Sequence, residues 1–111
     1  MSKEIFRVDK FVVPAHARQE FLTRVHATHE VLRTQPGFVR DAILEQTSGP
    51  GEFNFVTIVE WENGDAIEGA RKAVAALHQK MNFDPQAMIS RLEIRADIAN
   101  YKSVEQAMAA E

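Results

Sequence analysis

The fold can be worked out from the stretch Phe53-Asn54-Phe55-Val56-Thr57-Ile58-Val59-Glu60-Trp61. Its β-branched and aromatic residues predict a β-strand, in which successive side chains point to opposite faces. One face would carry Phe53, Phe55, Val59 and Trp61, and the other Val56 and Ile58. A sheet with one face in water alternates apolar with polar residues, whereas this strand is apolar on both sides. We therefore expect both faces of the sheet to be covered.

The chain on either side of this stretch supplies the remaining elements. We predict strands at 5–13, 38–46 and 91–101, helices at 15–34 and 64–81, and a short helical turn that begins at Asp84-Pro85. The Gly- and Pro-rich segment 47–51 predicts an antiparallel hairpin between the two middle strands. Pro36-Gly37 ends the first helix, and Asn63 caps the second.

These elements follow the order β-α-β-β-α-β, which is typical of the ferredoxin-like α+β fold. In that fold both helices lie on one face of a four-stranded antiparallel sheet. We expect a single domain over residues 1–111, with a core at 5–101 and a polar, Ala-rich tail at 102–111. Since no element is left to cover the second apolar face, we expect a homodimer in which two sheets pack together.

Composition excludes several classes of function. The net charge is −3 and the Lys and Arg residues are scattered, so the basic stripe of a nucleic-acid-binding protein is absent. There is no cysteine, which excludes thiolate metal sites and a Cys nucleophile and fits a reducing compartment. No apolar run is long enough for a membrane span, and the N-terminus has no signal-peptide pattern. We expect a soluble, cytoplasmic protein.

Three motifs give the chain a resemblance to a known family. They are Gln35-Pro36-Gly37-Phe38, the strand Phe55–Trp61, and Ala75-Ala76-Leu77-His78. In this order and spacing, residues 5–101 resemble the antibiotic biosynthesis monooxygenase family, whose members form dimeric α/β barrels. The resemblance implies a pocket between the sheet and the helices of each subunit. It also implies oxidation of a small aromatic or quinol-type substrate by O₂ without a cofactor, because the deprotonated substrate supplies the electrons.

His78 is the candidate catalytic residue. It lies on the apolar stripe of the second helix, and the family has a histidine late in this helix. An imidazole with a pKa near 6.5 suits a general base at neutral pH. The alternative is an inward histidine that is hydrogen-bonded to a neighbour and has no chemical role.

Four residues are candidates for substrate binding: Trp61, His29, Asn54 and Arg71. Trp61 would stack on an aromatic ligand, or anchor the sheet to the second helix. His29 lies on the inner stripe of the first helix and would polarise a substrate oxygen beside His78. Asn54 would place an oxyanion, and Arg71 would bind an acidic group. For these polar residues, and for Arg7, Asp9 and Arg40, a solvated or ion-paired role is the alternative.

No metal site is expected. His26 and His29 are three residues apart, but they point about 60° away from each other on the helix and have no inward carboxylate partner.

Three functions remain open. The first is a cofactor-independent monooxygenase. The second is haem degradation, which is weakened because the helix interior holds Ala70 and Val74 where that branch has a Trp, and the first strand offers Asp9 and Lys10 where it has an Asn. The third is a non-catalytic dimeric module that binds a small ligand or serves a stress response.

Overall fold

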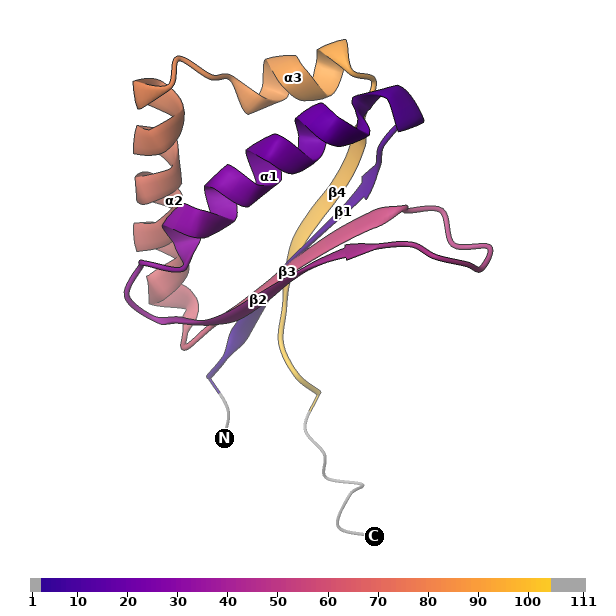
Figure 1. Ribbon diagram of the computed structural model, residues 1–111. Helices are drawn as coiled ribbons and strands as arrows, with labels where there is room; N and C mark the ends of the chain where they lie inside the picture. Colours follow the sequence, from indigo (N-terminus) through magenta and orange to yellow (C-terminus); the bar gives the residue numbers. More distant parts are fainter. Residues whose placement is uncertain (1–2, 105–111) are drawn as a thin grey trace, which may run out of the picture.

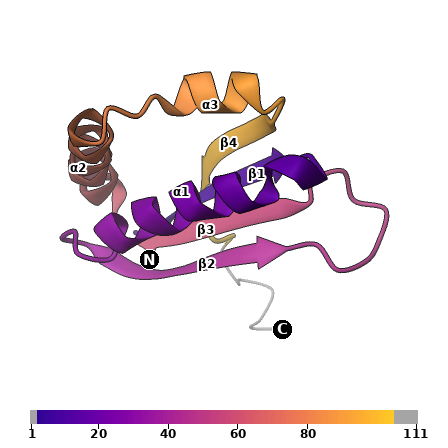
Figure 2. The same cartoon turned by 45° about the horizontal axis from the view of Figure 1, so that its top comes forward.

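A computed structural model describes residues 3–104. In chain order the elements are β1 (Ile5–Val12), a short 3₁₀ helix (Ala15–Ala17), α1 (Arg18–Leu32), β2 (Phe38–Glu45), β3 (Phe55–Trp61), α2 (Gly64–Lys80), α3 (Pro85–Arg91) and β4 (Arg95–Tyr101). The strands form one open antiparallel sheet in the order β2-β3-β1-β4, and the helices lie on one of its faces (Figures 1 and 2). The ferredoxin-like α+β fold predicted from the sequence is therefore confirmed.

The helix-facing side of the sheet carries two apolar clusters separated by a polar layer. Phe11, Phe21 and Phe55 belong to the first cluster. The ring centroid of Phe21 lies 4.9 Å from that of Phe11 and 5.2 Å from that of Phe55. Val59, Trp61 and Ala70 form the second. Between the clusters, Asp9 of β1 is paired in register with Thr57 of β3. Strand alternation thus places two polar side chains inward, between the apolar residues on either side.

The last third of the chain differs from the prediction. The expected short turn is a helix, α3, because the side chain of Asp84 accepts hydrogen bonds from the backbone N–H groups of Gln86 and Ala87 at 3.0 Å and 3.3 Å. Arg91 therefore ends a helix and does not begin a strand. Glu93 adopts a left-handed conformation with φ of 59°, and β4 starts only at Arg95. The predicted alternation over 91–94 was wrong, although Leu92 and Ile94 are buried in the core.

Gly37 joins α1 to β2 in a conformation that other residues rarely adopt. Its φ is +87°, and a Cβ atom at this position would overlap with Cβ of Ala66 in the first turns of α2. The Pro36-Gly37 turn therefore lets β2 approach the start of α2 closely, next to Trp61.

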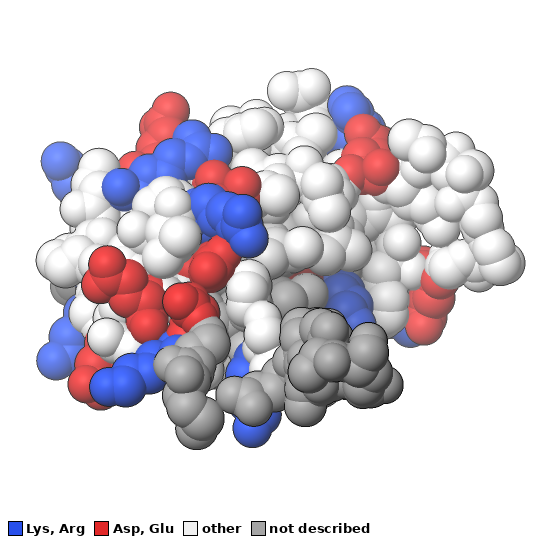
Figure 3. Space-filling view, turned by 90° about the horizontal axis from the view of Figure 1, so that it is seen from below, with Lys and Arg blue, Asp and Glu red and all other residues white. Residues whose placement is uncertain are grey.

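The opposite face of the sheet is covered by no element within residues 3–104. It presents Phe6, Val8, Ala42 and Ile58, together with the exposed Leu44 and Tyr101. Figure 3 looks onto this side, where uncharged residues extend from the centre of the molecule to the β2–β3 hairpin. No helix within the described residues is long and apolar enough to cross a lipid bilayer. Of the expected tail, residues 105–111 lie outside the described part of the chain.

Candidate active site

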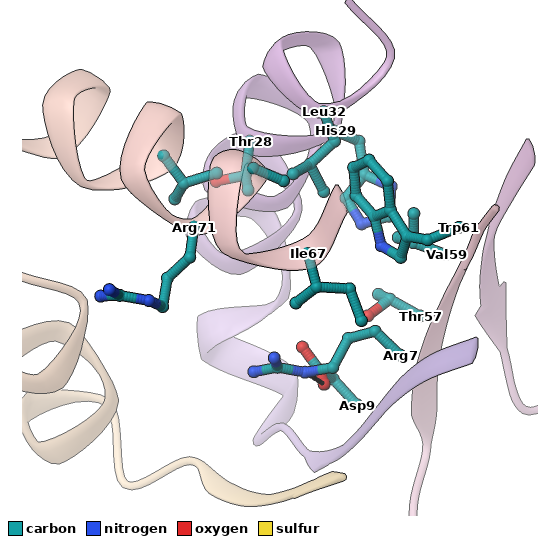
Figure 4. Close-up of a pocket in the computed structure, with 12 residues that line it drawn as sticks. Arg7, Asp9, Thr28, His29, Leu32, Thr57, Val59, Trp61, Ile67 and Arg71 are labelled. Carbon is teal, nitrogen blue, oxygen red and sulfur yellow. Dashed lines mark hydrogen bonds and ion pairs between the residues drawn. The ribbon is translucent and has the colours of Figure 1, made fainter. Parts of the chain in front are cut away.

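A cavity of about 210 Å³ lies between the helix-facing side of the sheet and the two long helices. It adjoins the second apolar cluster and includes the polar layer (Figure 4). Its lining consists of Arg7 and Asp9 from β1, Thr57, Val59 and Trp61 from β3, Thr28, His29 and Leu32 from α1, and Ile67, Ala70, Arg71 and Val74 from α2.

His29 is buried in the wall of this cavity, with an exposed fraction of 4%. Its Nδ1 lies 2.8 Å from Oδ2 of Asp41 on β2, and Nε of Arg33 donates to the same oxygen at 3.0 Å. Although burial acts to raise the pKa of Asp41, the hydrogen bonds from His29 and Arg33 hold it below its usual value. Asp41 is therefore ionised at neutral pH, and Nδ1 of His29 carries the proton that it donates.

The second ring nitrogen of His29 is available to a ligand. Nε2 has no hydrogen-bond partner within residues 3–104, and no buried side-chain nitrogen or oxygen in that range lacks one. Nε2 must therefore belong to the exposed part of the ring, which lines the cavity. A neutral His29 held by Asp41 at Nδ1 presents Nε2 as a hydrogen-bond and proton acceptor.

Arg7 and Asp9 form a second ion pair in the cavity wall. Nε of Arg7 donates to Oδ1 of Asp9 at 2.7 Å, and the side chain of Asp9 is 22% exposed. Burial raises the pKa of the Asp9 carboxyl, against the opposing effects of Arg7 and His29. Two acid–base groups, the His29–Asp41 pair and the Asp9 carboxyl, thus face the same cavity.

Trp61 and Arg71, two of the candidates for substrate binding, also line the cavity. Trp61 is 2% exposed and packs edge-on against Phe38, with ring centroids 5.8 Å apart. Arg71 lies on the exposed side of α2, where it is paired with Glu68 one turn earlier. Figure 4 places Trp61 and His29 close together, whereas the guanidinium groups of Arg7 and Arg71 extend toward the same side, away from Trp61.

His78 does not line the cavity that contains His29. Its ring packs edge-on against Phe83, with centroids 5.2 Å apart, in a separate small hollow that Arg24 also lines. Burial, together with the positive charge of Arg24, lowers the pKa of His78. The expectation that the two histidines share one pocket was therefore wrong, because His78 lies about 12 Å farther along the helix axis than Ala70.

Asn54 also lies outside the cavity. Its Oδ1 accepts from the backbone N–H of Val13, and its Nδ2 donates to the carbonyl of Val13, both at 2.8 Å. The side chain thus extends the pairing of β1 and β3 beyond the strand end. No group of three or more His, Asp or Glu side chains suited to hold a metal ion occurs in the described range.

Sequence reasoning missed three residues of the site: Arg7, Asp9 and Asp41. For Arg7 and Asp9 the signal was present, because strand periodicity places them on the same inward face of β1 as Ile5 and Phe11. For Asp41 the signal was misleading. Phe38 packs inward on Trp61, and a register shift between Phe38 and Arg40 reverses the alternation along β2.

Comparisons with known proteins agree with this architecture. Residues 5–80 match the family described as "Antibiotic biosynthesis monooxygenase". None of the curated proteins matches the chain.

Several solved structures share the fold at low sequence identity. SnoaB, a cofactor-independent oxygenase from Streptomyces nogalater, is 23% identical with a TM-score of 0.65, over 94% of this chain and 96% of SnoaB. The haem degrader MhuD from Mycobacterium tuberculosis is 22% identical with a TM-score of 0.66, over 91% and 96% of the two chains. A conserved protein from Methanosarcina mazei Go1 is 15% identical with a TM-score of 0.66, over 92% and 95%.

Proposed function

The chain belongs to the antibiotic biosynthesis monooxygenase family, and we propose that it is a cofactor-independent monooxygenase that oxidises a small aromatic or quinol-type substrate with O₂. The observation that carries the proposal is a buried histidine, oriented by an ionised carboxylate, in the wall of a cavity beside a tryptophan. This arrangement supplies a proton acceptor and an aromatic surface in one place.

His29 is the proposed general base, in place of His78. Asp41 accepts a hydrogen bond from the Nδ1–H group and stabilises the imidazolium that forms when Nε2 takes a proton from the substrate. His78 has no carboxylate partner within the described residues, and its neighbour Arg24 disfavours a second positive charge. Trp61 and Val59 form an apolar wall for the substrate ring.

The reaction balances without a cofactor when the substrate is a phenol with hydrogen on the para carbon. His29 takes the hydroxyl proton, and the phenolate transfers electrons to O₂ while a C–O bond forms at the para carbon as a peroxide. That carbon then loses its remaining proton as the O–O bond breaks. One oxygen atom stays as the second carbonyl of a quinone, and the other leaves with the two protons as water. The substrate thus supplies four electrons.

The size of the cavity limits the substrate. An engineered apolar cavity of roughly 150 Å³ binds benzene, and drug-sized ligands occupy pockets of roughly 300–1,000 Å³. A cavity of about 210 Å³ therefore suits one or two aromatic rings. A porphyrin is too large for it, and this volume disfavours haem degradation as the function of this chain.

We also propose that two copies form a homodimer through the open face of the sheet. The apolar residues Phe6, Val8 and Ile58 lie on this face, and exposed apolar surface of this kind is typical of an interface. The arrangement would give the dimeric α/β barrel that the family resemblance implies.

Oxygen uptake by the metal-free protein tests the function. The substrates are one- and two-ring phenols and hydroquinones, each corrected for its uncatalysed rate. We expect uptake by the wild type, and a loss of about 100-fold or more in His29→Gln, because removal of a general base costs about 10²–10⁴-fold. His26→Gln, an exposed histidine on the same helix, is the matched control.

The results separate the alternatives. Uptake that is lost in His78→Gln and kept in His29→Gln would restore His78 as the base. Binding of these compounds without uptake in any of them would favour the non-catalytic ligand-binding module.

A further inference from the structure

We propose that the substrate carries a carboxylate, and that Arg7 and Arg71 bind this group at the end of the cavity away from Trp61. The inference rests on the proposed function and narrows its substrate class to hydroxylated aromatic acids. Two guanidinium groups, from β1 and from α2, line one small cavity and extend toward the same side (Figure 4).

Arg7 has free donors for such a group. It uses only Nε to bind Asp9, at 2.7 Å, and its two terminal nitrogens have no hydrogen-bond partner within residues 3–104. The pair of terminal nitrogens is the edge of a guanidinium that binds a carboxylate through two parallel hydrogen bonds. Asp9 thus holds Arg7 by one edge and leaves the other edge open.

Arg71 also has a partner that a ligand can replace. It pairs with Glu68 three residues earlier on the same helix, and the two side chains are 65% and 57% exposed. Such exposed pairs are screened by solvent and contribute little, so a carboxylate held by two guanidinium groups can compete with Glu68. Arg71 can also bind the carboxylate through its free Nη1 while it stays paired with Glu68.

The charge of the cavity favours an anion. Apart from His29, the ionisable residues that line the cavity are two arginines and Asp9, which give a formal charge of +1, whereas the whole chain carries −3. No carboxylate other than Asp9 lines the cavity within the described residues, and Asp9 is already bonded to Arg7. An anionic substrate would therefore meet positive charge at this end of the cavity.

The two ends of the cavity then orient the substrate. The carboxylate lies between the arginines, and the ring extends toward Trp61 and His29, which lie together in Figure 4. This orientation places a phenolic hydroxyl near the proposed base. Arg7 and Arg71 are therefore specificity-determining residues, and they do not take part in proton transfer.

The test compares two ligands that differ only in the acidic group, 6-hydroxy-2-naphthoate and 2-naphthol, because the hydroxyl and the carboxylate of the acid lie at opposite ends of the ring system. Isothermal titration calorimetry of the full chain at pH 7 gives the dissociation constant of each. We expect the acid to bind about tenfold or more tightly than the naphthol, because charge-assisted hydrogen bonds contribute about 1.5–3 kcal/mol and 1.4 kcal/mol corresponds to a factor of ten. Arg7→Gln and Arg71→Gln should each reduce this preference, taken as the ratio of the two dissociation constants, at least about threefold.

Two further variants make the result specific. Lys72→Gln removes a positive charge from the residue next to Arg71, outside the cavity lining, and should leave the preference unchanged. Arg7→Lys keeps the charge without the two-nitrogen edge, and it should retain part of the preference.

Equal or tighter binding of 2-naphthol by the wild type would overturn the carboxylate proposal and leave the proposed cavity intact. A preference that Lys72→Gln reduces as much as Arg71→Gln would overturn it as well, because the cause would then be general surface charge. Binding of neither ligand would overturn the cavity as a ligand site, and the proposed function with it.

Discussion

Nδ1 of His29 lies 2.8 Å from Oδ2 of Asp41, and the exposed fractions of the two side chains are 5% and 11%. α1 carries the histidine and β2 carries the carboxylate, so the pair links the helix layer to the sheet at the edge of the cavity. Nε of Arg33 donates to the same oxygen of Asp41 at 3.0 Å. The orientation of the imidazole is therefore fixed by two elements, which is what a general base in a small cavity requires.

Asp41→Asn should lower kcat/KM for oxygen uptake by about tenfold to a hundredfold while His29 remains in place. The amide cannot stabilise the imidazolium as a carboxylate does, and its NH₂ group can favour the wrong tautomer of His29. Glu30→Gln, on the exposed surface of α1, is the control and should keep wild-type kinetics. Equal rates for Asp41→Asn and the wild type would exclude a role of this pair in catalysis.

The two partly buried carboxylates, Asp9 and Asp41, should affect stability with opposite dependence on pH. The pKa of Asp9 is raised in the folded state, mainly by burial, so its contribution to stability is fully present below the ordinary value of 3.8 and is lost as the pH rises through the folded pKa. The pKa of Asp41 is lowered by its hydrogen bonds despite burial, so its contribution is present above 3.8 and is lost as the pH falls through the folded pKa.

Urea unfolding at pH 3 and pH 7 measures this difference. Relative to the wild type, Asp9→Asn should gain stability as the pH rises from 3 to 7, and Asp41→Asn should lose stability over the same range. Changes of the same sign in both variants would contradict the assigned directions.

The order of elements could be predicted because it depends on local signals. The apolar alternation of β3, the Gly- and Pro-rich hairpin and the cap at Asn63 each act within a few residues. α3 was underestimated because Leu92 and Ile94 continue the apolar spacing of β4, although both precede this strand and the left-handed Glu93 lies between them. Leu92 and Ile94 are thus apolar because they are buried in the core, and not because they belong to a strand.

The site was only partly predictable because it depends on how far each element extends. His29 and His78 both lie on inward helical stripes, and periodicity does not tell which of them stands above the cavity. The position along the helix determines which histidine lines the cavity. The segment of α2 from Ile67 to Val74 covers the cavity, and His78 lies beyond this segment. The inward position of Asp41 depends on the register shift between Phe38 and Arg40 in β2, and no sequence pattern in that strand predicts this shift.

Gly37→Ala should destabilise the protein by about 2–5 kcal/mol. A left-handed conformation costs an alanine about 1–2 kcal/mol, and the overlap of its Cβ with Ala66 adds a packing penalty of about 1–3 kcal/mol. The matched control is Gly69→Ala on the exposed side of α2, where a Cβ meets no atom within 4 Å. This variant should gain about 0.5–1 kcal/mol from helix propensity. Urea unfolding of both variants checks the contrast, and similar losses in the two would refute it.

The proposed homodimer should dissociate when a charge is placed at the centre of the open sheet face. Ile58 lies on this face between β1 and β2, where its neighbours in register are Val8 and Ala42. In a face-to-face dimer, Ile58→Lys would bury an unpaired ammonium group against the partner, which costs several kcal/mol. Sedimentation velocity at micromolar concentration should therefore give a dimer for the wild type and a monomer for Ile58→Lys. Glu30→Lys, on the exposed surface of α1, is the control and should remain dimeric. A monomeric wild type would refute the dimer itself, and the apolar face would then need another partner.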